Sequence, residues 1–118
     1  MTASTRGVVE AHIKAFNDHD LNAMMQCFTE DALWITGRDA FSGAREIEEL
    51  FSNAFSGLTP HLSVNSFISD NETLAAAELT EEIVLDGKTK TFAIAGFYRI
   101  ENGKLSSAKI YREGSADA

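Results

Sequence analysis

The last third of the chain, residues 73–112, constrains the fold more than any other stretch. It contains three runs rich in β-branched, aromatic and apolar residues, a composition typical of strands. Two turn signals separate the runs, Asp86-Gly87 and Glu101-Asn102-Gly103. We therefore predict a three-stranded antiparallel meander. One face of it must be covered by the rest of the chain, because a sheet buries its apolar face against other elements.

The lengths of the two turns decide which residues of the meander lie opposite one another. A two-residue first turn places Glu81 opposite Phe92, although the row that contains Glu81 is otherwise apolar. For the second turn, a three-residue loop sets Ile94 against Ile110 and Phe92 against Arg112. A two-residue loop would instead send Arg112 to the other face. We prefer the three-residue loop because it pairs apolar with apolar residues, and it leaves Glu81, Phe92 and Arg112 in one row.

The first half of the chain predicts three helices, each with apolar residues at helical spacing. The first covers residues 5–18, and Asp20 is the expected N-cap of the second. The third begins at Ala44, and Gly57 and Pro60 end it. The three apolar stripes are Val9, Ile13 and Phe16; Leu21, Met24, Met25 and Phe28; and Ile47, Leu50, Phe51, Ala54 and Phe55.

Two shorter strands complete the expected elements. Residues 32–37 form an apolar run whose length and composition favour a strand, with Trp34 and Thr36 on one side. Residues 61–69 alternate between apolar and polar side chains and also predict a strand. The segment between the first of these strands and the third helix, residues 38–43, is expected to be a loop.

Composition limits the partners and the compartment. A length of 118 residues suits a single domain, residues 1–118, and its small polar tail at 113–118 is expected to fray. The net charge of −8 disfavours nucleic acid and anionic membranes, and no apolar run approaches the roughly 20 residues of a membrane span. Cys27 is the only cysteine and the first residues lack the apolar core of a secretory signal, so we expect a cytoplasmic protein.

Four stretches of the chain together resemble a known family. They are Asp20-Leu21 between the first two helices, residues 28–34, the helix start at 43–47 and the closing hairpin at 97–105. In this order they resemble SnoaL-like domains of the nuclear-transport-factor-2-like and ketosteroid-isomerase-like superfamily. The resemblance implies an α+β fold in which a cone-shaped, curved mixed β-sheet wraps around three N-terminal helices. It also implies a pocket at the wide end of the cone and frequent dimers.

The resemblance carries few functional residues over to this chain. The tyrosine with which ketosteroid isomerases polarise the substrate carbonyl falls at His12, the aspartate base at Thr36 and the second acid at Gly96. All three are replaced, so steroid isomerisation is not expected. The paired acids and the arginine of limonene-epoxide-hydrolase-like members cannot be placed on this sequence.

The inner face of the predicted sheet still carries polar groups among its apolar residues. We predict that Glu81 acts as general base or acid with its pKa raised by burial, and that His12 or Tyr98 polarises a ligand oxygen. No His-x-His or Cys-His cluster indicates a metal, and no glycine-rich phosphate loop indicates a cofactor. The other residues predicted to bind a small apolar molecule are Phe16, Trp34, Thr36, Phe92, Ile94, Gly96, Ile110 and Arg112.

Each of these residues also has a purely structural interpretation, so three functions stay open. The chain could be a cofactor-independent isomerase, cyclase or hydrolase, a non-catalytic binding domain, or an interaction domain with a filled pocket. Glu81 and Arg112 could be a structural ion pair. Contact between them is expected to keep Glu81 ionised, whereas an Arg112 that points away would leave burial to raise the pKa of Glu81.

The outer face of the meander predicts a contact with a second copy of the chain. The middle of this face is small and apolar, which is unusual for a sheet exposed to solvent. We therefore predict a two-fold homodimer through this face. Its residues are Thr80, Glu82, Val84, Ala93, Ala95 and Phe97.

Overall fold

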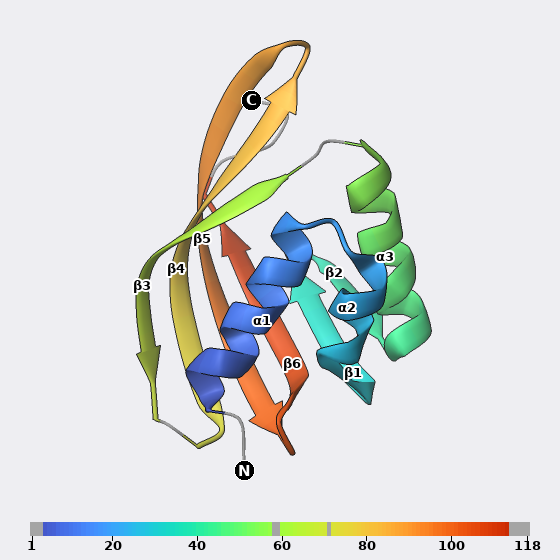
Figure 1. Ribbon diagram of the computed structural model, residues 1–118, viewed down its shortest axis with the longest axis vertical. Coiled ribbons are helices and arrows are strands. Elements are labelled where there is room, and N and C mark those ends of the chain that lie inside the picture. The colour runs from blue at the N-terminus through green and yellow to red at the C-terminus, as the bar shows by residue number, and fades with distance from the viewer. Residues whose placement is uncertain (1–3, 58–59, 71, 114–118) are drawn as a thin grey trace.

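The computed structural model describes residues 4–57, 60–70 and 72–113 (Figure 1). In these residues three helices pack on one side of a curved, unclosed sheet of six strands. The expected α+β fold class is therefore confirmed. The helices are α1 (Thr5–Asn17), α2 (Leu21–Gln26) and α3 (Ala44–Gly57). The strands are β1 (Phe28–Thr36), β2 (Asp39–Ser42), β3 (His61–Ser69), β4 (Leu74–Leu85), β5 (Lys88–Glu101) and β6 (Lys104–Arg112).

Short polar side chains set where the first two helices begin. Ser4 is the N-cap of α1, and its hydroxyl accepts a hydrogen bond from the Gly7 N–H at 3.0 Å. Asp20 caps α2 in the same way through the Ala23 N–H at 3.0 Å, as predicted. The apolar stripe of α1 is then buried, and His12 is buried with it.

The strands are arranged in the order β2-β1-β6-β5-β4-β3. β1 and β6 are parallel and the other neighbours are antiparallel, so the sheet is mixed. Figure 1 shows the helices on one face of this sheet, with the β4–β5 hairpin extending beyond them. Of the tail expected to fray, the structure describes only Glu113, whose N–H donates to the Ala93 carbonyl at 2.9 Å. Residues 114–118 lie outside the described residues.

The turn between β5 and β6 differs from the prediction. It has two residues, Asn102-Gly103, both with positive φ (52° and 76°), because this dipeptide suits the tight turn between twisted strands. The three-residue loop was wrong. A bulge at Ser106 follows, so that Arg112 lies opposite Ile94 and not opposite Phe92. The extra residue restores the alternation, and Arg112 therefore still faces inward.

Residues 38–43, expected to be a loop, contain the short strand β2. It pairs with the end of β1, from Thr36 opposite Asp39 to Leu33 opposite Ser42. Gly37 has a φ of 60°, a conformation that glycine adopts without steric cost and that lets the chain reverse at once. The strand is brief and exposed for most of its length, so it lacks the apolar alternation by which sequence marks a strand.

One side chain ties the end of α1 to the edge strand β3. Asn17 donates from Nδ2 to the Leu62 carbonyl at 2.9 Å, and its Oδ1 accepts from the Leu62 N–H at 2.7 Å. The amide thereby pairs backbone groups that an edge strand would otherwise leave to solvent. Nearby, His19 Nε2 is bonded to the Pro60 carbonyl at 3.0 Å. These contacts hold the start of β3 beside the interior of the fold.

Candidate functional site

A cavity of about 270 Å³ lies between the inner face of the sheet and the helices α1 and α3. It is slightly below the usual size of ligand pockets and would hold roughly nine water molecules at about 30 Å³ each. Most of its wall is aliphatic or aromatic. The polar and ionisable residues that line it are His12, Thr36, Asn53, Glu81, Tyr98 and Arg112.

His12 belongs to an aromatic cluster in the cavity wall. Its ring centroid lies 5.4–6.2 Å from those of Phe28, Trp34, Phe51 and Tyr98. Burial lowers the pKa of His12 to about 4, because apolar surroundings disfavour the imidazolium. Its Nδ1 has no hydrogen-bond partner among the described residues. His12 is therefore neutral at pH 7 and has a nitrogen left for a hydrogen bond.

Glu81 and Arg112 form the charged part of the cavity wall. Arg112 Nη2 lies 2.6 Å from Glu81 Oε1, which confirms the expected contact. The two groups are an ion pair by distance, but the N–H approaches at an angle that does not make a hydrogen bond, so Oε1 has no donor in the described part of the chain. The Glu81 side chain is 7% exposed and that of Arg112 is 33% exposed. The carboxylate is thus enclosed and the guanidinium lies at the open side.

The pKa of Glu81 does not follow the expectation from the ion pair alone. Contact with Arg112 predicted that attraction would outweigh burial, yet the pKa of Glu81 is raised above its ordinary value. Burial is the larger effect, because it removes water from the charged form, and the attraction of Arg112 only partly opposes it. Glu81 therefore combines a charge contact with a proton affinity above that of an ordinary glutamate.

Tyr98 occupies the space that Gly96 leaves on the same strand. A Cβ atom at position 96 would overlap the ring and hydroxyl of Tyr98. Gly96 consequently does not line the cavity, whereas Tyr98 and Ile110, the residue opposite Gly96, both do. Burial raises the pKa of the Tyr98 hydroxyl, so the phenol keeps its proton and is available as a donor.

The predicted site residues other than Gly96 and Phe92 all line this one cavity. Phe92 lies opposite Glu81, as predicted, but its ring sits under the Arg112 guanidinium, 5.6 Å from the centroid to Cζ. Phe51 and Leu79 also line the cavity but were not among the predicted site residues. Phe51 belongs to the apolar stripe of α3 and Leu79 to the inward-facing row of β4, so both patterns could have indicated them. Asn53 carried no signal, because a polar residue on a helix is normally assigned to solvent.

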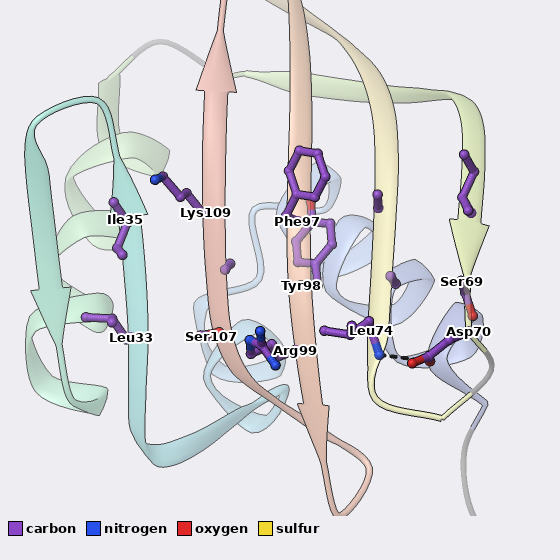
Figure 2. Close-up of a pocket in the computed structure, with 14 residues that line it drawn as sticks. Leu33, Ile35, Ser69, Asp70, Leu74, Phe97, Tyr98, Arg99, Ser107 and Lys109 are labelled. Carbon is purple, nitrogen blue, oxygen red and sulfur yellow. Dashed lines mark hydrogen bonds between the residues drawn. The ribbon is translucent and has the colours of Figure 1, made fainter.

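A second concavity, of about 540 Å³, lies on the outer face of the sheet. Figure 2 shows Phe97 and Arg99 of β5 there, with Leu33 and Ile35 of β1 to one side and Leu74 of β4 to the other. Phe97 is 52% exposed. Exposed apolar surface of this kind is typical of interaction sites.

The described residues hold no cluster of three or more His, Cys, Asp or Glu side chains placed to bind a metal ion. None of the described helices is long and apolar enough to cross a membrane.

Comparison with known families gives a match over most of the chain. The pattern that defines the SnoaL-like domain matches residues 9–108. The chain belongs to the SnoaL-like domain family. No curated protein sequence matches it significantly.

Several solved structures share the fold of this SnoaL-like domain. One is a hypothetical protein with a ketosteroid-isomerase-like fold from Catenulispora acidiphila in complex with trimethylamine (15% identity, 88% of this chain and 83% of that chain covered, TM-score 0.80). Another is the epoxide hydrolase/cyclase-like enzyme SalBIII of pyran ring formation in salinomycin (16%, 92% and 89%, 0.83). A third is an epoxide hydrolase from M. tuberculosis (16%, 90% and 80%, 0.81). At these identities the likeness shows the fold alone.

We predict that His12 makes the folded state less stable in acid. The unfolded chain binds a proton at His12 with the ordinary pKa of 6.5, whereas the folded chain binds it only near 4. Between these values the unfolded state holds more protons, so the free energy of unfolding decreases as pH falls, by up to about 1.4 kcal/mol per pH unit. Urea unfolding of the wild type and His12→Gln at about pH 7 and about pH 5 measures this contribution.

The His12→Gln variant should lose less stability than the wild type between those two pH values. Glu81 acts in the opposite direction, because a raised carboxyl pKa makes the folded state bind the proton first. That effect is present in both proteins and cancels in the comparison. Equal losses in both proteins would contradict the burial of a neutral His12.

Proposed function

We propose that this SnoaL-like domain binds a small, mainly apolar molecule in its inner cavity and carries out general acid–base chemistry on it. The observation that carries the proposal is Glu81, a carboxyl with raised pKa enclosed in an apolar cavity. Such a group can accept a proton from a ligand and return it at another atom, or, once it is protonated, donate its proton to the ligand as a general acid. Isomerisation, cyclisation and hydrolysis are reactions of this type.

Two neutral groups complete the proposed site. His12 is not an imidazolium at pH 7, so its role is a hydrogen bond to a ligand oxygen and not proton donation from a charged ring. Tyr98 keeps its proton and can donate a second hydrogen bond. Both stabilise charge that develops on an oxygen while Glu81 moves the proton.

The reaction class is supported by neighbours of the same fold, which include an epoxide hydrolase/cyclase-like enzyme and an epoxide hydrolase. The complex of another neighbour with trimethylamine supports a small ligand. A second candidate function is binding without turnover. The direct contact of Glu81 with Arg112 favours it, because a carboxylate held in an ion pair can have a purely structural role.

Ligand binding should change the fluorescence of Trp34, the sole tryptophan, because its ring lines the cavity. We expect a saturable change on titration with cyclohexanol. Ala54→Phe, which fills the cavity from α3, should abolish the change. Ser52→Phe, on the exposed side of the same helix, is the matched control and should retain it. The proposed pocket would be contradicted if the wild type showed no saturable fluorescence change. It would also be contradicted if the Ala54→Phe variant showed the same change as the wild type.

Acid–base chemistry should depend on Glu81. A suitable probe is 5-nitrobenzisoxazole, because a base removes its ring C–H proton while the N–O bond breaks to give a coloured cyanophenolate. We expect the wild type to accelerate this reaction, increasingly as pH rises through the raised pKa of Glu81. Glu81→Gln should lose at least tenfold in rate and still bind cyclohexanol. Unchanged turnover in Glu81→Gln would contradict acid–base chemistry by Glu81 and would favour a domain that only binds its ligand.

We also propose that the domain forms a two-fold dimer through the outer face of the sheet. Phe97 and Tyr111 form an exposed edge-to-face pair there, with ring centroids 5.7 Å apart. The face carries acidic Glu78 and Glu82 on β4 and basic Arg99 and Lys109 on β5 and β6. Two copies related by a two-fold axis can oppose these charges while the apolar centre is buried.

Phe97→Glu should dissociate this dimer, because it places a charge in the middle of the contact. Sedimentation at micromolar concentration should show a dimer for the wild type and a monomer for the variant. Val64→Glu is the control, since Val64 is also exposed but lies in the groove between α1 and β3. A monomeric wild type would contradict the dimer.

A further inference from the structure

We infer that the ligand of the inner cavity is an apolar monocarboxylate, with its carboxylate on Arg112 at the open side and its apolar part directed towards the aromatic wall. This inference rests on the proposed function and names its substrate class. It starts from the difference in exposure between the two charged residues of the cavity. A ligand that enters meets the guanidinium first, because the Glu81 side chain is 7% exposed and that of Arg112 is 33% exposed.

Arg112 is suited to hold a second carboxylate. Among the described residues, its side chain makes a charge contact with Glu81 and lies over the Phe92 ring. The first is not an aligned hydrogen bond, and the second is an electrostatic attraction to the aromatic ring and not a hydrogen bond. A guanidinium carries five N–H donors in a planar fork that matches a carboxylate. The geometry therefore leaves donors for a bidentate contact with a ligand.

The other groups around Glu81 favour an anion over a cation. Besides Glu81, the ionisable residues that line the cavity are Arg112 of β6, His12 of α1 and Tyr98 of β5, and the last two carry no charge at pH 7. An ammonium ligand would have to displace Arg112 from Glu81 and remain beside that guanidinium.

A ligand carboxylate beside Glu81 would be repelled unless one of the two carboxyls is protonated. Burial already favours the protonated form of Glu81, and a carboxylate on Arg112 weakens the attraction that opposes it. Glu81 should therefore take a proton from the buffer as the ligand binds. An O–H bond forms on Glu81, the O–H or N–H bond of the buffer acid breaks, and no bond within the ligand changes. The two carboxyls then share one guanidinium, and the net charge of Glu81, Arg112 and the ligand carboxylate together is zero.

The size of the cavity selects the probe. A space of about 270 Å³, equal to roughly nine waters, suits a ligand of about ten non-hydrogen atoms. Octanoate has this size, and octan-1-ol and octylamine offer the same chain with a neutral and a positive head group. Comparison of the three at pH 7 separates the charge of the head group from the burial of the chain.

Isothermal titration calorimetry in phosphate and in Tris tests the inference, because the difference in heat between the buffers reports proton uptake. We expect octanoate to bind at least tenfold more tightly than octan-1-ol or octylamine, with uptake of up to one proton. Arg112→Gln should lose this preference and retain the affinity for octan-1-ol, and Arg112→Lys should keep part of it. Lys109→Gln, which removes a cation from the outer face, should leave every affinity unchanged.

Three results would overturn the inference while leaving the pocket intact. They are binding of octan-1-ol or octylamine as tight as that of octanoate, a preference for octanoate that survives in Arg112→Gln, and octanoate binding without proton uptake. Failure of all three probes to bind a folded wild type would instead contradict the proposed function itself. Circular dichroism of each variant distinguishes lost binding from lost folding, and Arg112→Lys keeps the charge if Arg112→Gln does not fold.

Discussion

The pairing of β4, β5 and β6 is the constraint on which the rest of this protein depends. Side chains of a strand alternate between two faces, so a shift by one residue would exchange the interior and the surface. The tight turn at Asn102-Gly103 would by itself send Arg112 outward, and the bulge at Ser106 returns it to the inner face. The contact between Arg112 and Glu81 exists because the bulge reverses the change of face that the turn alone would cause.

One physical cause, removal of water by an apolar wall, gives the ionisable groups of the cavity their character. It lowers the pKa of His12 and raises the pKa values of Glu81 and Tyr98, so each of the three shifts towards its uncharged form. Arg112 keeps its charge and a partly exposed position. The cavity is therefore an apolar container with neutral donors inside and a cation at its open side.

The two faces of the sheet have separate properties because the helices cover only one of them. The inner face, under α1 and α3, encloses the cavity. The outer face leaves Phe97 and Tyr111 exposed around a wider concavity. Small-molecule binding and assembly can then reside in one small domain without competing for the same residues.

The sequence by itself determined the helices, the long meander, the family and most of the cavity wall, because apolar periodicity, caps and turn residues act over a few neighbours. Only the tertiary structure decided the short strand β2, the register of β6 and the filling of the space at Gly96 by Tyr98. It also decided the proton affinity of Glu81, in which burial outweighs an ion pair. Each of these depends on opposing effects between distant segments, whose balance is set by distances and angles that no local pattern encodes.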